Sequence, residues 1–302
     1  MSQSANPALD PRTAATLTAP RTRSRWRWLR QLLRNRAATV SLVFLIILTL
    51  SAVFAPLIAP YDPNAQDYEF LAPPSREHLF GTDDLNRDLF SRIIYGARVS
   101  LFVGVVTVLF SMVIGVALGL WAGYYGGWVD TVIMRYIDLQ WAFPNFIIAV
   151  YLVAVFGTGL LNVIVAITLA FLDDFARIVR GMVLSLRSQE FVEASRATGA
   201  HNNRIILRHI LPNTLAPIIV QATVSVSYAI LAEAGLSFLG LGVESSTPTW
   251  GLILSDARSF FSRAWWLAVF PGLAITLTVL SINFLGDALR DILDVREYTE
   301  EG

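Results

Sequence analysis

The sequence of 302 residues contains neither cysteine nor lysine. Without cysteine, the chain can form no disulfide, no thiolate nucleophile and no cysteine-ligated metal site. Without lysine, it cannot contain a phosphate-binding loop of the form GxxxxGKS or GxxxxGKT, because the lysine of that loop contacts the phosphates. If ATP drives this protein, the nucleotide must therefore bind to another chain.

Charge is also scarce in this sequence. Charged residues make up 15% of the chain and hydrophobic residues 55%, whereas a soluble domain carries about 25% charged residues. The net charge is zero, so no overall field favours nucleic acid. Neither a GxSxG nor an HExxH motif occurs, and His78, His201 and His209 lack the spacing of metal ligands. We therefore expect a membrane protein that has no catalytic residue, metal or cofactor of its own.

Long uncharged runs predict six membrane spans, since a helix of about 20 apolar residues crosses the hydrocarbon core of a bilayer. The first span occupies 37–61, and the region 99–288 holds the other five. These five begin near Val99, Trp128, Leu160, Ile210 and Ala264, with a kink at Pro144 in the third and an end at Asp173 in the fourth. The expected fold is an all-α integral membrane protein with a basic tail at 1–36 and a second tail at 289–302.

The distribution of arginine predicts the orientation of the spans. If both termini are cytoplasmic, the cytoplasmic side holds 17 arginines: eight in the N-terminal tail, Arg135, six from Arg177 to Arg208, and two in the C-terminal tail. The opposite side holds six. The positive-inside rule therefore places both termini and the loop 184–212 in the cytoplasm. A cleaved signal peptide is the less favoured alternative, because the first apolar run is longer than an h-region.

Two loops, 62–98 and 236–264, are expected on the extracytoplasmic side. In the first, Leu85, Leu89 and Ile93 recur at helical spacing behind Thr82 and Asp83, which are suitable N-caps. This pattern predicts an amphipathic helix that lies at the membrane surface and leads into the second span. We interpret the charges of this loop as a docking surface for another protein rather than as an ordinary solvated loop.

Small residues recur every four positions along the second span. Ser111, Gly115 and Gly119 form a small-xxx-small face that would let a neighbouring helix approach closely. Gly123 and Gly127 continue the spacing, but they follow the apolar stretch and are equally consistent with a loop.

The polar segment Gln189–Pro212 has helical character but lies between membrane spans, so it is expected to dock onto another protein. Its first helix should end with Gly199 in the left-handed conformation. Asn202 or Asn203 can cap a second short helix, and Pro212 suits the first turn of the fifth span. A bent helical pair attached rigidly to two spans would move those spans when pushed.

This segment resembles the EAA loop of ABC importer permeases. That loop has Glu-Ala-Ala, three residues, Gly, nine residues, Ile, one residue and Leu-Pro. The matching residues are Glu193, Ala194, Ser195, Gly199, His209, Leu211 and Pro212. Ser195 departs from the third alanine and His209 from the isoleucine, and both substitutions keep helical character.

A second resemblance narrows the family to the C-type subunit of the dipeptide/oligopeptide/nickel permeases. The extracytoplasmic signature of that subunit is matched by Gly81, Thr82, Asp83, Arg87, Asp88, Ser91, Arg92, Gly96 and Arg98. Asn86 stands where that family usually has glycine.

The resemblance implies a type I ABC importer permease in the bacterial inner membrane. The chain would form half of a translocation pathway for peptides or related small solutes. Its partners would be a second homologous permease, two ATPase subunits that bind ATP and Mg²⁺, and an extracytoplasmic substrate-binding protein. Glu193–Gly199 would be the coupling helix. The cargo and its binding residues stay open, because dipeptides, oligopeptides, nickel chelates, glutathione and sugars are all carried in this subfamily.

Other carboxylates in apolar surroundings leave alternatives open. Asp173 and Asp174 could form a proton relay, but Arg177 beside them at the expected cytoplasmic end of the fourth span favours a structural role. Glu233 suits a contact with cargo or partner as well as it suits a structural carboxylate. A stand-alone secondary transporter or channel is the alternative function, disfavoured because the chain shows no related halves and carries the EAA pattern.

Overall fold

The computed structural model describes residues 27–300. In this part of the chain the secondary structure is helical, and the one extended pairing is an isolated bridge between Thr82 and Asp88. The expected all-α class is therefore confirmed. Most of the basic tail predicted at 1–36 lies outside the described residues.

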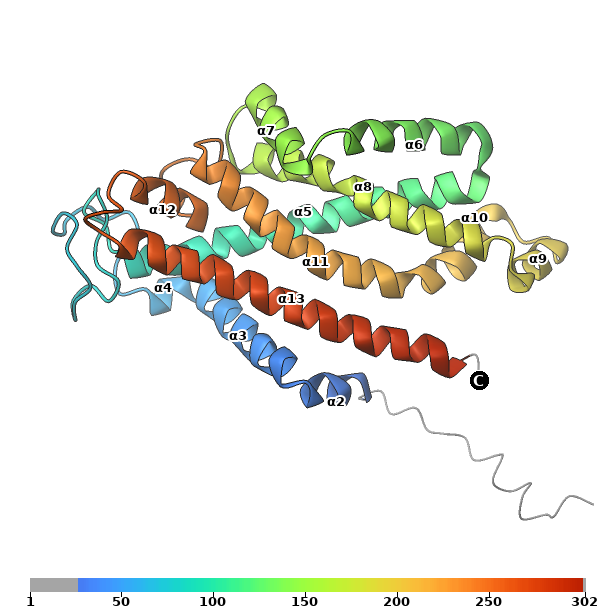
Figure 1. Ribbon diagram of the computed structural model, residues 1–302, viewed down its shortest axis with the longest axis horizontal. Helices are drawn as coiled ribbons and strands as arrows, with labels where there is room; N and C mark the ends of the chain where they lie inside the picture. Colours follow the sequence, from blue (N-terminus) through green and yellow to red (C-terminus); the bar gives the residue numbers. More distant parts are fainter. Residues whose placement is uncertain (1–26, 301–302) are drawn as a thin grey trace, which may run out of the picture.

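The helices, in chain order, are α2 (Arg27–Arg34), α3 (Arg36–Val53), α4 (Ala55–Ile58), α5 (Leu89–Tyr125), α6 (Gly127–Trp141), α7 (Asn145–Phe156), α8 (Leu160–Leu186), α9 (Glu190–Ala197), α10 (Asn202–Ile205), the π-helical turn η1 (Ile206–Ile210), α11 (Leu211–Phe238), α12 (Trp250–Ala257) and α13 (Trp266–Glu300). Figure 1 shows the long helices running side by side along the molecule. The loop before α5 lies with α4 and α12 at one end, and α9 lies at the other.

Four helical segments in the described chain are long and apolar enough to cross a membrane: α3, α5, the continuous run α10–η1–α11 and α13 over Trp266–Leu293. A fifth is reached if α6 and α7 together count as one span, although they bend by 92° at their break. Pro144 is the residue before α7, so the predicted kink is in fact a right-angled break. Proline cannot continue the hydrogen bonds of the preceding helix, which explains its position there.

The fourth predicted span corresponds to α8, which differs from the prediction in its length. The helix does not end at Asp173 but continues to Leu186. It can do so because two of its arginines are paired with carboxylates of α6: Arg180 Nε lies 2.5 Å from Asp130 Oδ1, and Arg177 Nη2 lies 3.1 Å from Asp138 Oδ1. The charges that were expected to mark the end of a span are therefore inside a long helix.

The start of α5 also corrects the prediction from sequence. Residues 62–88 form no α-helix, and α5 begins at Leu89 with Asp88 as its N-cap, whose carboxylate accepts the Ser91 amide at 2.8 Å. Neither Thr82 nor Asp83 caps a helix. The expected surface helix is thus the first part of a single helix of 37 residues, about 55 Å long at 1.5 Å per residue.

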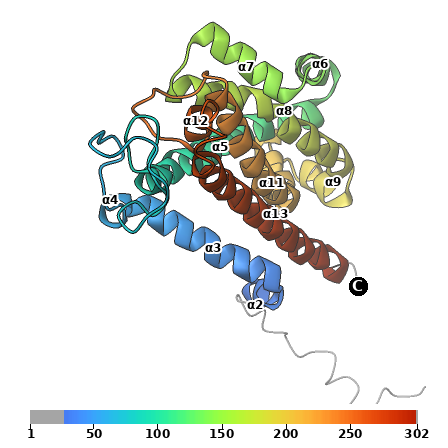
Figure 2. The ribbon, with the colours of Figure 1, turned by 60° about the vertical axis from the view of Figure 1, so that its left-hand side comes forward.

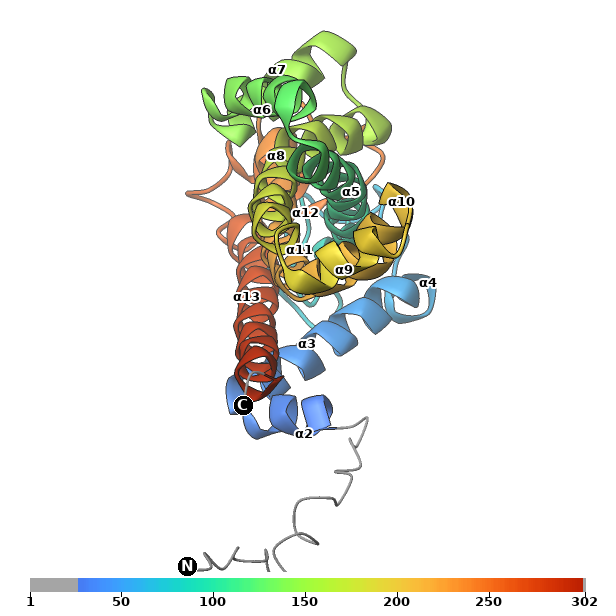
Figure 3. The same ribbon diagram turned by 90° about the vertical axis from the view of Figure 1, so that its right-hand side faces the viewer.

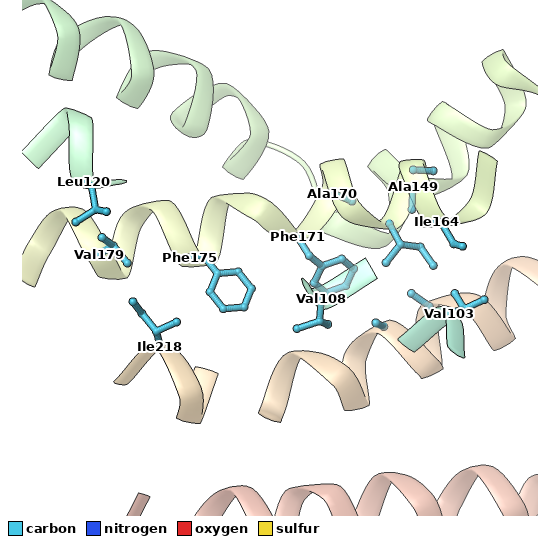
Figure 4. Close-up of a cluster of buried hydrophobic side chains, with 14 of the residues drawn as sticks. Val103, Val108, Leu120, Ala149, Ile164, Ala170, Phe171, Phe175, Val179 and Ile218 are labelled. Carbon is cyan, nitrogen blue, oxygen red and sulfur yellow. The ribbon is translucent and has the colours of Figure 1, made fainter. Parts of the chain in front are cut away.

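The core is built where α5, α8 and α11 meet. Phe171, Phe175 and Val179 of α8 are buried with Val108 of α5 and Ile218 of α11 (Figure 4). Turned by 90°, the ribbon shows α8 lying between α5 and the α6–α7 pair (Figure 3). The helix α3 packs instead along α13, on the outer side of this core (Figure 2). The central pair α5–α8 is therefore the axis of the fold.

Small residues on α5 allow α8 to pack closely against it. A Cβ atom on Gly119 would lie 2.5 Å from the Ala176 carbonyl oxygen, and one on Gly115 would lie 2.7 Å from the Phe175 Cβ atom. Gly123 belongs to the same face, since its Cβ would lie 2.7 Å from that of Val183. The stripe thus extends one turn further than the predicted residues.

Candidate functional site: the cytoplasmic-loop helices and the outer polar cluster

The short helix α9 is anchored by one side chain and exposes most of the others. Val192 is fully buried in the main core, together with Ile205, Ile206 and Ile210 from the following turns. By contrast, Glu193 and Ala194 on the same helix are exposed. An apolar anchor holds the helix against the spans and leaves a polar face with no partner in the described chain.

Gly199 terminates α9 in the predicted manner. Its φ is +81°, in the left-handed region that glycine adopts without steric cost. The Gly199 amide donates to the Arg196 carbonyl at 2.9 Å and the Ala200 amide donates to the Ser195 carbonyl at 3.1 Å. This is a complete Schellman motif, which satisfies the last carbonyl groups of the helix and sets the direction of the chain.

Ser195, which replaces an alanine of the resembled pattern, remains compatible with the helix. Its hydroxyl donates to the Phe191 carbonyl one turn earlier, at 2.8 Å. This hydrogen bond satisfies the Ser195 hydroxyl within the helix itself. The departure at this position therefore leaves the local fold unchanged.

The chain leaves the Schellman turn through α10, and its cap corrects the prediction. The N-cap is His201 rather than Asn202 or Asn203, and it makes no side-chain capping bond. Asn202 instead accepts a hydrogen bond from the Tyr124 hydroxyl at 2.9 Å, and the Arg196 guanidinium lies 5.3 Å from the centre of the Tyr124 ring. The hydroxyl contact was invisible in the sequence because its partners are 78 residues apart.

The entry to α9 is tied to the same end of α5. Arg187, the C-cap of α8, donates from Nη1 to the Gly123 carbonyl at 3.0 Å. Together with the Tyr124 contacts, this bond attaches the segment from Arg187 to Asn202 to the last turn of α5. The segment that contains α9 is thus attached to three long helices: α5, α8 and α11.

Pro212 lies inside a continuous helix and not at the start of a separate one. The π-helical turn Ile206–Ile210 precedes it, and the Leu211 amide reaches back five residues to the Ile206 carbonyl. A π turn widens the helix, which accommodates a proline ring that would clash in regular α geometry. The Asn213 side-chain amide donates to the His209 carbonyl at 2.6 Å, so that carbonyl has a partner.

At the opposite end of the molecule, the residues of the extracytoplasmic motif form a buried polar cluster. Arg87 Nε lies 2.7 Å from Asp83 Oδ2, and Arg92 Nε lies 3.3 Å from the same oxygen. Both arginines also reach Asp256 of α12, at 3.3 Å and 3.7 Å. Arg92 is fully buried and Asp83 is 2% exposed. The cluster therefore connects the loop, the start of α5 and α12.

Two of the three neighbouring carboxylates, Asp83 and Asp256, are paired with arginines. Oxygen atoms of Asp83, Asp84 and Asp256 lie within 4.8 Å of one another, but Arg87 and Arg92 supply positive charge in the same place. Burial raises the pKa of Asp84 and of Asp256 above the ordinary carboxyl value. The arrangement is an ion-pair network.

Further contacts attach the motif to α13 and to the loop. The Trp266 indole donates to the Thr82 carbonyl at 3.1 Å, and His78 Nδ1 lies 2.8 Å from Asp88 Oδ1. Gly81 has φ +82°, and a Cβ on it would lie 2.9 Å from the Trp266 indole nitrogen. Gly96 packs under Trp250.

The exposure of these residues changes the interpretation of the loop as a docking surface. Thr82, Asp83, Arg87, Asp88, Ser91 and Arg92 are all buried within this chain, so they cannot contact another protein directly. Arg98 is the exposed member of the motif. The exposed acidic residues of the loop are Asp62, Asp67, Glu69 and Glu77, and none of them belongs to the motif.

Glu233 is a structural carboxylate in this fold. It is fully buried, and its oxygens accept hydrogen bonds from the Ser100 hydroxyl at 3.0 Å and the Ser237 hydroxyl at 2.8 Å. The Ser100 hydroxyl also accepts the Trp250 amide at 3.4 Å. Glu233 thereby joins α5, α11 and α12, and its partner Ser100 was not singled out from the sequence.

The adjacent carboxylates of α8 differ from each other. Asp173 is fully buried, and neither of its oxygens has a hydrogen-bond partner in the described chain. Asp174 lines a cavity between α7, α8 and α11. Sequence reasoning placed both at the cytoplasmic end of a span, whereas the structure places them near the middle of α8.

Comparison with known proteins relates this arrangement to a family. Residues 115–297 match the family described as binding-protein-dependent transport system inner membrane component, and residues 24–74 match the N-terminal TM domain of oligopeptide transport permease C. The chain is 48% identical over 270 residues to the dipeptide transport system permease protein DppC of Alkalihalophilus pseudofirmus, covering 88% of each chain. It is 45% identical over 276 residues to the glutathione transport system permease protein GsiD of Pectobacterium atrosepticum, covering 90% of this chain and 91% of the other.

A solved structure shares the fold. An inward-facing conformation of the MetNI methionine ABC transporter superposes with a TM-score of 0.54 at 22% sequence identity. The superposition covers 66% of this chain and 95% of the matched chain.

Proposed function

Because this chain belongs to the family of binding-protein-dependent transport system inner membrane components, we propose that it is the C-type permease subunit of an ATP-driven importer of peptides. It is a multi-pass protein of the inner membrane, in keeping with its apolar helices. The peptide cargo is supported by similarity to permeases named for dipeptide, peptide and glutathione transport.

The proposed topology has six spans with both termini in the cytoplasm. The proposed spans are α3, α5, the broken pair α6–α7, α8, α11 and α13. This set adds α8 to the segments that qualify by length and composition. The arginine distribution supports the orientation. In this topology the loop 184–212 is cytoplasmic, and the outer polar cluster and α12 are extracytoplasmic.

The face of α9 that carries Glu193 and Ala194 is proposed to fit a groove on an ATPase subunit. The observation that carries this proposal is the contrast between buried Val192 and the exposed polar residues around it. ATP and Mg²⁺ would bind to two such ATPase subunits, since this chain has no lysine for a phosphate-binding loop. The rigidity of α9 would come from Gly199, from Ser195 and from the turn that precedes Pro212. Closure of the ATPase subunits would therefore tilt the spans.

The remaining proposed partners are a second, homologous permease and an extracytoplasmic substrate-binding protein. Exposed apolar side chains on α7 and α8, such as Ile147, Tyr151 and Leu161, would contact lipid or the second permease. The outer polar cluster would hold the extracytoplasmic end of the spans in a fixed shape. The binding protein would dock onto this end and release its cargo there.

Reconstitution tests this function. The chain is purified with its partner permease and ATPase subunits, inserted into proteoliposomes that contain ATP, and supplied with loaded binding protein and radiolabelled dialanine outside. We expect uptake that requires ATP, the binding protein and this chain together. Uptake that continues with catalytically inactive ATPase subunits would instead identify a secondary transporter or channel.

A further inference from the structure

A cavity of about 520 Å³ opens between α7, α8 and α11. Its apolar wall includes Phe146, Phe171 and Leu231, and its polar groups belong to Asn145, Asp174 and Tyr228. A mostly apolar cavity with a few polar groups from different elements is typical of a small-molecule site.

Asp174 occupies a position where a carboxylate is costly. It follows Leu160 by 14 residues and precedes Leu186 by 12 within α8, which places it about 21 Å and about 18 Å from the two ends of the helix. In the proposed topology this is close to the middle of the membrane. An ionised carboxylate at that depth is normally retained for a function and is matched by a cation.

The nearby cations of this chain are already bound to other groups. Arg180 donates from Nε and Nη2 to both oxygens of Asp130, at 2.5 Å and 2.7 Å. Arg177 donates to Asp138 at 3.1 Å and lies 4.2 Å above the Trp141 ring. Within the described residues, no side-chain hydrogen bond and no ion pair within 4 Å joins Asp174 to another group, although the Arg177 charge lies near enough to act on it. The cavity therefore presents a carboxylate whose nearest cation is already paired with Asp138.

A second cavity lies further along the same face of α8. Phe171, Asp174 and Ile178 share one face of α8, at positions i, i+3 and i+7, and Ile178 lines a second cavity of about 370 Å³. This second cavity is bordered by Val220 and Gln221 of α11, about two helical turns closer to the loop 184–212 than Tyr228.

We propose that this cavity is a cargo contact site in the translocation pathway, and that the Asp174 carboxylate binds the α-ammonium group of a peptide. This inference rests on the importer function proposed above. Every unmodified peptide carries an α-ammonium group. A single carboxylate can therefore bind peptides in general, whatever their amino-acid sequence. The aromatic and aliphatic wall accepts varied side chains, and the Tyr228 ring can face the ammonium group.

The first test compares two adjacent carboxylates in the reconstituted complex. Asp174→Asn should lower ATP-dependent uptake of dialanine about tenfold, as expected when one hydrogen-bonded charge partner is lost. Asp174→Glu should restore most of the rate. Asp173→Asn is the matched control, because Asp173 is also an aspartate at the same depth but does not line the cavity, and its uptake should stay within twofold of the unchanged complex. ATP hydrolysis stimulated by the loaded binding protein should persist in all three.

The second test uses the absence of cysteine from this chain. Leu231→Cys places a thiol in the wall of the cavity and keeps Asp174, and a positively charged methanethiosulfonate reagent should label it more slowly when the complex turns over with dialanine. Asp138→Cys, on α6 and outside the cavity, should be labelled at the same rate with and without peptide.

The outcomes separate the site from the function. If the unchanged complex shows no ATP-dependent uptake, the importer proposal fails and this inference fails with it. If that complex transports but Asp174→Asn transports equally well, or Asp173→Asn is equally impaired, the cargo site alone is wrong. Labelling at position 231 that is unaffected by peptide would also overturn it.

Discussion

The Tyr124 hydroxyl of α5 donates a hydrogen bond of 2.9 Å to the side chain of Asn202, at the start of α10. This contact joins the C-terminal end of the longest helix in the described chain to the segment that follows the Schellman turn. In the proposed importer it lies between the ATPase contact and the spans, so it should transmit motion between them.

Tyr124→Phe should loosen this connection. The variant loses one hydrogen bond, worth about 1 kcal/mol, while the ring that faces Arg196 remains. We expect the number of peptides taken up per ATP hydrolysed in proteoliposomes to fall about twofold to fivefold. Tyr125→Phe is the matched control, because the Tyr125 hydroxyl makes no hydrogen bond within the described residues. Equal ratios for the two variants would show that the contact plays no part in coupling.

Gly199→Val should abolish ATP-dependent uptake without preventing membrane insertion. No atom lies within 4 Å of a Cβ built on Gly199, so the effect comes from the backbone alone. A β-branched residue at φ +81° is strained by about 1–2 kcal/mol or more. Gly199→Asn should keep more activity, since asparagine tolerates this region. Gly181→Ala, in open space inside α8, is the neutral control. Normal uptake by the valine variant would mean that the turn is not needed for coupling.

Glu193→Arg should reduce co-purification of the ATPase subunits. Glu193 is exposed on the face of α9 proposed to meet them, and the change reverses its charge. Glu190→Arg provides the comparison, because it makes the same change in the first turn of the same helix and has the same effect on the helix dipole. Quantitative gel densitometry of purified complexes measures both. Unchanged stoichiometry and uptake for Glu193→Arg would remove it as a docking residue.

Gly119→Ala should destabilise the pairing of α5 with α8. The added methyl group would lie 2.5 Å from the Ala176 carbonyl oxygen and 2.8 Å from the Val179 Cβ atom, so the helices must separate. Overpacking of this kind costs about 1–3 kcal/mol, which should lower the Tm of the purified protein in detergent by several degrees. Gly272→Ala, in a helix with no atom within 4 Å of the new Cβ, should leave the Tm unchanged or slightly raised.

Asp256→Asn should remove a pH-dependent part of the stability. Burial raises the pKa of Asp256, so in the window from about pH 4 up to the raised value the folded protein binds more protons than the unfolded chain. The stability of the unchanged protein should therefore fall as the pH rises through this window. The Asp256→Asn variant should lack this component in Tm measurements, whereas Asp67→Asn, on the exposed part of the loop, should retain it. Parallel curves for all three proteins would contradict the prediction.

Local features explain what could be predicted from the sequence. The spans follow from uncharged stretches, and Gly199 was expected to be left-handed because the helical pattern before it stops there. The stripe from Ser111 to Gly119 was recognised because its spacing places small residues on one helix face. In each case the relevant residues lie within a few turns of one another.

Predictions failed where a distant partner changed the outcome. Thr82 was expected to cap a helix, but its carbonyl accepts the Trp266 indole and its hydroxyl donates to the Glu69 carbonyl. Asp173 was expected to mark the end of a span, but pairing of Arg180 with Asp130 lets α8 continue. Neither partner could be found from residues nearby in the sequence.

The sequence by itself determined that this chain enters a membrane, that it contains no GxxxxGKS or GxxxxGKT loop, and where a helix must end in glycine. These properties depend on composition and on local backbone geometry. Only the tertiary structure decided which polar residues are buried and which are available to a partner. Arg87 meets Asp256 across 169 positions and Ser100 meets Glu233 across 133, so their pairing is a consequence of how the helices pack, and the same packing leaves Asp174 facing an open cavity.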